Sequence, residues 1–194
     1  FGNNPSEAFS SSLFLHLGSG TAALLYFRND ISRILISSIK RPKAMSYDSK
    51  FLLTTTAVSG TLGLPLLLII ENLATVTYFK STALYSMIII GILMILTGCI
   101  LKYSSRTSND HSKNPSIKEG ILAGIAQGLS VIPGISRSGM TISVMITRGF
   151  DHREALKLSF IMCIPVSISA GFYAIVFQSI GFDINSLIAL GVSF

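Results

Sequence analysis

The chain has 194 residues, of which 49% are hydrophobic and only 12% are charged, and its mean hydropathy is +0.62. Soluble domains carry about 25% charged residues, so this composition excludes an ordinary soluble domain and predicts an integral membrane protein. The net charge of +6 does not indicate a nucleic-acid partner, because fourteen of the fifteen lysines and arginines fall in polar connections between apolar segments. Those connections are 28–50, 71–82, 102–118 and 148–157.

The apolar segments predict a polytopic bundle of membrane-spanning helices. A bilayer core requires about 20 helical residues, and the first segment, 11–27, is at the short end of that range. Segments 51–70, 83–101 and 155–177 are full-length spans, and 184–194 is the start of another. The fold class that we expect is therefore an all-α integral membrane protein with a single membrane domain over 1–194.

The region of about 120–148 differs from these spans. It is almost free of charge over about 28 residues, which would make one straight helix of about 42 Å, against a hydrocarbon core of about 30 Å. The dipeptide Pro133-Gly134 breaks it near the centre. Two half-length helices, about 120–131 and 138–148, then form a re-entrant pair that enters the membrane and returns to the same side.

Three glycines in the first half-helix have a spacing of four residues. Gly120, Gly124 and Gly128 form a doubled GxxxG pattern, which allows another helix to approach closely. The alternative is that the glycines are incidental.

The distribution of charge predicts the orientation of the chain. Loops 28–50, 102–118 and 148–157 are rich in lysine and arginine, whereas 71–82 has one lysine and one glutamate. The positive-inside rule places the three basic loops in the cytoplasm and 71–82 outside. This assignment is consistent only if the re-entrant pair returns to the cytoplasmic side.

The loop at the tip of the pair, in "VIPGISRSGMTIS" (131–143), contains Arg137. An arginine at membrane depth requires a partner or water, and no Asp or Glu lies within the apolar segments. Its guanidinium is a bidentate ligand for phosphate, and Ser136, Ser138 and Thr141 add hydroxyl groups. The start of the second half-helix contributes free N–H groups and the positive end of a dipole.

Three further residues are candidates for the same anion site. Gly134 and Gly139 allow the backbone to approach a ligand, and Gln127 either lines the site or forms a hydrogen bond to another helix. The structural alternative is that a serine only caps the helix and that Arg137 binds backbone carbonyls or extends to the interface. Cys99 and Cys163 lack the spacing of metal ligands, and we predict no metal site from the residues of this chain.

The segment "GIAQGLSVIPGISRSGMTIS" (124–143) closely resembles the second signature of the undecaprenyl-diphosphatase family, integral-membrane enzymes linked to bacitracin resistance. Segments 15–31 and 153–171 resemble the neighbouring family helices, so the resemblance covers nearly the whole chain. It implies an inverted-repeat fold and hydrolysis of a polyprenyl diphosphate to the monophosphate and inorganic phosphate, which recycles the carrier for cell-envelope and peptidoglycan synthesis. By matching positions, it makes Ser136, Arg137 and Thr141 catalytic-site residues.

The resemblance also implies a plasma-membrane location, a polyprenyl diphosphate lipid as partner and a divalent cation, Mg²⁺ or Ca²⁺. The family's first signature, with its glutamates, would precede residue 1, so we expect both ends of the chain to be truncated and the metal ligands to lie in the absent N-terminal segment. A homo-oligomer is compatible with this interpretation. Two other classes stay open at this point, namely a transporter or channel for anions and a non-catalytic protein that binds lipid phosphates.

Overall fold

The computed structural model describes residues 5–40, 45–75, 83–106 and 114–177, together with Gly191 and Ser193. In these ranges it contains helices and no strand. The helices are α1 (Pro5–Tyr26), α2 (Arg28–Lys40), α3 (Tyr47–Thr75), α4 (Ala83–Arg106), α5 (Ile117–Leu129), α6 (Arg137–Thr147) and α7 (His152–Phe177). The expected all-helical membrane architecture is therefore confirmed, whereas the inverted repeat stays a prediction.

Three of the described helices are long and apolar enough to cross a membrane. These spans are Tyr47–Ile70 in α3, Met87–Ser105 in α4 and His152–Val176 in α7. The segment predicted at 11–27 is helical within α1 but is not among the three, and its role as a span stays a prediction. The segment predicted at 184–194 lies outside the described residues, apart from Gly191 and Ser193.

The chain divides into two compact units. In the first, α1 packs against the C-terminal part of α7, because a Cβ on Gly20 would lie 2.7 Å from that of Ser167 and one on Gly171 would lie 2.7 Å from that of Leu17. The residue numbers rise on α1 as they fall on α7, so the two helices are antiparallel. The second unit, 33–160, contains α3 to α6 and all the candidate site residues.

The glycine ridge of α5 packs directly against α3. A Cβ added at Gly120 would lie 3.1 Å from the Phe51 carbonyl oxygen. One added at Gly124 would lie 2.7 Å from the Val58 Cβ, and one added at Gly128 would lie 2.9 Å from the Leu62 Cβ. The contacts advance along both helices together, which makes α3 and α5 parallel. The prediction of a close helix approach is thus confirmed, and the glycines are not incidental.

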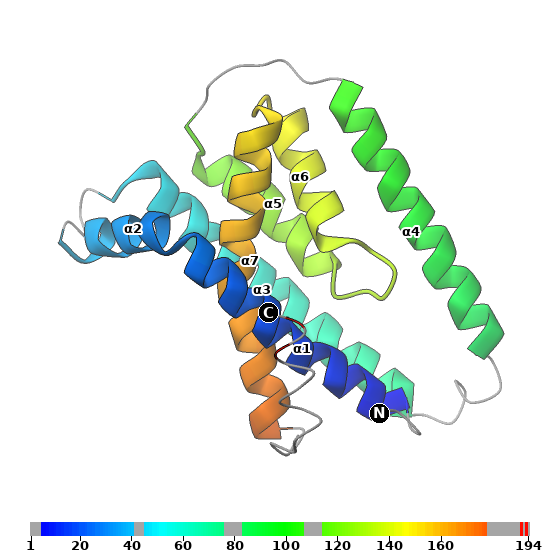
Figure 1. Cartoon of the computed structure of the whole chain (residues 1–194). Coiled ribbons are helices and arrows are strands. Elements are labelled where there is room, and N and C mark those ends of the chain that lie inside the picture. Colours follow the sequence, from blue (N-terminus) through cyan, green and yellow to red (C-terminus); the bar gives the residue numbers. More distant parts are fainter. Residues whose placement is uncertain are drawn as a thin grey trace. The chain divides into compact units, whose positions relative to one another are not determined.

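Helix α6 packs in the same way against α4. A Cβ on Gly134 would lie 2.8 Å from the Ile90 carbonyl oxygen, and one on Gly139 would lie 2.9 Å from Cγ2 of Thr97. Because the numbers again rise together, α6 runs parallel to α4. Figure 1 shows the resulting order, with the α5–α6 hairpin between α3 and α4.

Hydrogen bonds also join the hairpin to the long helices. The Thr55 hydroxyl donates to the Gly120 carbonyl at 3.2 Å, and Gln127 Nε2 donates to Ser59 Oγ at 3.2 Å. Ser59, Thr55 and Gln127 are buried. Polar bonds between buried helices fix the register of α5 on α3 in addition to the glycine contacts.

Candidate functional site

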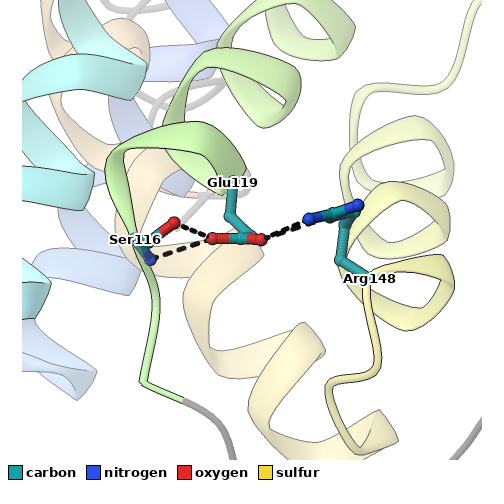
Figure 2. A network of polar contacts seen from close by, with 3 residues as sticks. All are labelled: Ser116, Glu119 and Arg148. Atoms are coloured by element: carbon teal, nitrogen blue, oxygen red, sulfur yellow. Dashed lines mark hydrogen bonds and ion pairs between the residues drawn. The ribbon is translucent and has the colours of Figure 1, made fainter.

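An ion pair closes the base of the α5–α6 hairpin (Figure 2). Arg148, which follows α6, donates from Nη2 to Glu119 Oε1 at 2.9 Å and from Nε to the same oxygen at 3.2 Å. The other carboxylate oxygen of Glu119 accepts from the Ser116 N–H at 3.1 Å and from the Ser116 hydroxyl. Since Glu119 lies in the first turn of α5 and Arg148 follows α6, the C-terminal end of α6 lies beside the N-terminal end of α5.

The two half-helices are each too short to cross a membrane. Helix α5 has 13 residues and α6 has 11 residues. Their lengths are about 20 Å and about 17 Å, against a hydrocarbon core of about 30 Å. A Cβ on Gly63, within the α3 span, would lie 3.4 Å from Val131, and Gly134 lies against Ile90 within the α4 span. The tip of the hairpin therefore lies beside the candidate spans of α3 and α4, and its re-entrant position in a membrane stays a prediction.

The tip is a pair of tight turns between Leu129 and Ser136. Backbone bonds from Ile132 to the Leu129 carbonyl and from Ile135 to the Ile132 carbonyl, both 3.1 Å, define the two turns. Gly134 has φ of +99°, which a residue with a side chain rarely adopts. Pro133 disfavours continuation of the helix here, because its ring clashes with the carbonyl of Leu129 and it lacks an N–H.

Helix α6 starts directly after these turns. Ser136 is its N-cap, and its hydroxyl accepts the Gly139 N–H at 3.2 Å. Ser136 and Ser138 are exposed, and Arg137 between them is half-buried. The two serine hydroxyl oxygens are 3.5 Å apart. One guanidinium and two hydroxyls thus lie at the positive end of a helix dipole, which is an arrangement suited to a phosphate group.

The other predicted site residues lie beneath this surface. Thr141 is fully buried, and its hydroxyl bonds to Ser159 Oγ on α7 at 2.7 Å and to the Arg137 carbonyl at 2.9 Å. Gly139 and Gly134 lie against α4, and Gln127 is 2% exposed and bonded to α3. The structure therefore places Ser136, Arg137 and Ser138 at the start of α6. Thr141, Gly139 and Gln127 are buried, and Gly134 is part of the turns of the tip.

The described residues do not supply a set of metal ligands. They contain no group of three or more His, Cys, Asp or Glu side chains placed to hold a cation. Glu119 is buried but is engaged by Arg148 and Ser116. A Mg²⁺ or Ca²⁺ site needs several oxygen ligands, so the residues present in the described part do not fit one by themselves.

Sequence reasoning missed two contributors to the hairpin. The pattern Ser116-x-x-Glu119 forms a capping box, and such a pattern is a signal for the start of a helix such as α5. Ser159 is a single serine in an apolar helix, and nothing in its sequence context identifies it as the partner of Thr141. Its role becomes visible only when α6 and α7 are placed together.

Comparison with known proteins identifies the family of the chain. The family model described as "Bacitracin resistance protein BacA" matches residues 2–194. A protein of Methanococcoides burtonii named undecaprenyl-diphosphatase is 37% identical over all of this chain and 73% of its own length. A protein of the same name from Saccharolobus islandicus is 38% identical over 87% of this chain and 59% of its own length.

A third relative, from Sulfurisphaera tokodaii, carries the same name. It is 37% identical over 95% of this chain and 66% of its own length. The chain thus spans between 59% and 73% of the length of these three relatives. Because the family model matches residues 2–194 and a relative is 37% identical over the whole chain, the chain belongs to the bacitracin resistance protein BacA family.

Proposed function

We propose that this chain takes part in hydrolysing the terminal phosphate of a polyprenyl diphosphate, as the name of its relatives indicates. The products would be the polyprenyl monophosphate and inorganic phosphate, and the monophosphate would return to cell-envelope synthesis. The observation that carries the proposal is the tip of the hairpin, where Arg137 lies between the exposed Ser136 and Ser138 at the start of α6.

In this proposal the residues of the tip bind and neutralise the phosphate groups. Arg137 donates paired N–H groups to phosphate oxygens, and the two serine hydroxyls complete the contact. The bond between the terminal phosphoryl group and the polyprenyl monophosphate breaks as an oxygen that derives from water bonds to the terminal phosphorus. Negative charge is redistributed over the phosphate oxygens, and a fixed guanidinium stabilises that charge without reorganisation. The prenyl tail lies in lipid beside the helices, which accounts for a phosphate site at membrane depth.

The divalent cation is also a proposal. Mg²⁺ or Ca²⁺ would neutralise diphosphate charge, and its carboxylate ligands would come from outside the described residues. The plasma membrane is proposed as the location because the carrier lipid of cell-envelope synthesis resides there.

The test is phosphate release from a long-chain polyprenyl diphosphate by the complete gene product in detergent. We expect Arg137→Ala to lower kcat/KM by about 10²- to 10³-fold, the loss seen when one donor to a developing charge is removed. Arg153→Ala is the matched control, because Arg153 is an exposed arginine at the start of α7 and should leave the rate unchanged.

Three results would contradict the proposal. Turnover of the Arg137→Ala variant at the rate of the natural protein would show that Arg137 is not part of the site. Anion flux in proteoliposomes without any phosphate release would indicate a transporter instead. Binding of the lipid with neither activity would indicate a carrier of lipid phosphates.

A further inference from the structure

Helix α2 is a short helix with basic residues at both ends. It has 13 residues, from Arg28 to Lys40. Its length is about 20 Å, so it cannot cross a hydrocarbon core of about 30 Å. It nevertheless carries large apolar side chains on its surface. Leu35, Ile36 and Ile39 are 53%, 51% and 78% exposed.

One side of α2 is attached to the first turn of α3. Ile34 is buried, and its carbonyl accepts the Ser49 hydroxyl at 3.3 Å. Ser37 Oγ lies 3.3 Å from Ser49 Oγ and 3.5 Å from Ser46 Oγ. These bonds hold α2 at the level of Tyr47, where the membrane span of α3 begins.

The apolar and basic residues of α2 follow one another around its axis. At about 100° per residue, Leu35, Ile39 and Ile36 occupy one continuous arc, which begins about 100° from the buried Ile34 and ends about 200° from it. Lys40 and Arg33 come next, at about 240° and about 260°. The basic residues therefore border the exposed apolar arc on one edge, between Ile36 and Ser37, which lies at about 300° and contacts the first turn of α3.

This arrangement is that of a helix lying in the membrane interface. Such helices insert an apolar face to the depth of the acyl boundary while lysine and arginine extend to the headgroups. Residues 28–50 contain six basic and two acidic residues, a net charge of +4, so the leaflet on this side is attractive if its headgroups are anionic. We propose that α2 docks on the membrane surface through Leu35, Ile36 and Ile39 and gathers anionic lipids at Arg33 and Lys40.

The absence of tryptophan from the sequence makes depth measurable with one substitution. Ile39→Trp would place a single indole at the most exposed position of the arc. In this 194-residue chain in vesicles of mixed neutral and anionic lipid, we expect emission at shorter wavelength than in water and strong quenching by lipids brominated in the upper acyl chain. Leu96→Trp, on the exposed side of α4, is the reference that should be quenched best by deeper bromines.

The lipid preference needs a second comparison. Bromine is placed either on phosphatidylglycerol alone or on phosphatidylcholine alone, at the same total composition. We expect Ile39→Trp to be quenched more by the brominated anionic lipid, and Leu96→Trp to be quenched equally by both. Adding Arg33→Gln and Lys40→Gln should abolish the difference, since each basic residue contributes about fivefold to local anionic lipid attraction.

Three results would overturn the inference. Emission at long wavelength with efficient iodide quenching would place α2 in water. Emission at short wavelength without bromolipid quenching would place the arc against protein, such as a second copy of the chain. Equal quenching by the two brominated lipids would show that α2 does not gather anionic lipids.

Discussion

The hydroxyl of Thr141 illustrates how position changes the role of a residue. The sequence predicts that this threonine, four residues after Arg137, contacts the phosphate, but its side chain is fully buried and bonded to Ser159 at 2.7 Å. Its bond to the Arg137 carbonyl, 2.9 Å, instead fixes the first turn of α6. This geometry supports a role in positioning Arg137, and a direct contact with phosphate stays a prediction.

Replacing either member of the pair distinguishes these roles. Thr141→Val should lower the free energy of unfolding by about 1–3 kcal/mol, because Ser159 loses its buried partner. Ser159→Ala should cost about 1 kcal/mol, and both variants should slow phosphate release, with non-additive effects when combined. Thermal unfolding in detergent and phosphate release measure these quantities, and Thr141→Ser, which retains the hydroxyl, is the control. Loss of release in Thr141→Val with full release in Ser159→Ala would instead indicate direct contact with phosphate.

Gly134 combines a backbone and a packing requirement. Gly134→Ala must keep φ at +99° and place a Cβ 2.8 Å from the Ile90 carbonyl oxygen. We expect a loss of about 2–4 kcal/mol from the two effects together, read as a lower unfolding temperature. Gly98→Ala on α4 is the matched control, because its added Cβ has nothing within 4 Å. Equal unfolding temperatures for the two variants would show that the tip rearranges freely.

The sequence is informative about chemistry at the tip but not about burial. Ser136, Arg137 and Ser138 can be grouped because they are consecutive and follow a helix break. The sequence assigns Gly134 and Gly139 to the same anion site and leaves Gln127 between that site and a bond to another helix. The structure shows the two glycines packed against α4 and Gln127 bonded to α3. Which side of a half-helix faces a neighbour depends on helices distant in the sequence, and local patterns do not contain that information.

At the scale of elements, the sequence predicts the hairpin with boundaries displaced by a few residues. Helix α5 begins at Ile117 rather than 120, because Ser116 and Glu119 satisfy its first N–H groups. It ends at Leu129 rather than 131, where the chain enters the tight turns that precede Pro133. Helix α3 begins at Tyr47 rather than 51, since the Ser46 hydroxyl accepts the Ser49 N–H at 3.3 Å. A serine hydroxyl in this position caps the start of a helix.

The ion pair at the base of the hairpin should be needed to keep its two ends together. Glu119 is 1% exposed and Arg148 is 40% exposed, so Arg148→Ala leaves a buried carboxylate that water reaches only in part. We expect a loss of about 1–3 kcal/mol, less than for a fully buried pair, and faster hydrogen exchange at the ends of α5 and α6. Exchange measured by mass spectrometry tests this, with the exposed Arg153→Ala as control.

A second substitution separates the charge from the cap. Glu119→Gln keeps an acceptor for the Ser116 N–H and loses the ion pair, so it should be milder than Glu119→Ala. If exchange in α5 and α6 were the same in all three variants as in the natural protein, packing alone would hold the hairpin.

At the scale of the whole molecule, charge counting predicts that the re-entrant pair returns to its own side, and the Glu119–Arg148 bond joins those two ends. Which side is cytoplasmic stays a prediction. In a background where Cys99 and Cys163 are replaced by alanine, Ser81→Cys in loop 71–82 should react with an impermeant maleimide in intact cells. Asn109→Cys in loop 102–118 should react only after permeabilisation.

Two patterns of labelling would contradict this orientation. The reverse pattern would show that the protein has the opposite orientation in the membrane. Reaction of both cysteines from one side would show that α4 does not cross.

The parallel pairing of α5 with α3 and of α6 with α4 has a consequence for how this protein tolerates insertions and deletions. The depth of Arg137 is set where Gly120, Gly124 and Gly128 meet α3 and where Gly134 meets α4. A change in the length of the 107–116 connection leaves those contacts untouched, whereas one residue gained within α5 would rotate its glycines off α3 by about 100°. Loop length and the depth of the site are therefore free to vary independently, and length variation among family members should accumulate in the connection and not in the half-helices.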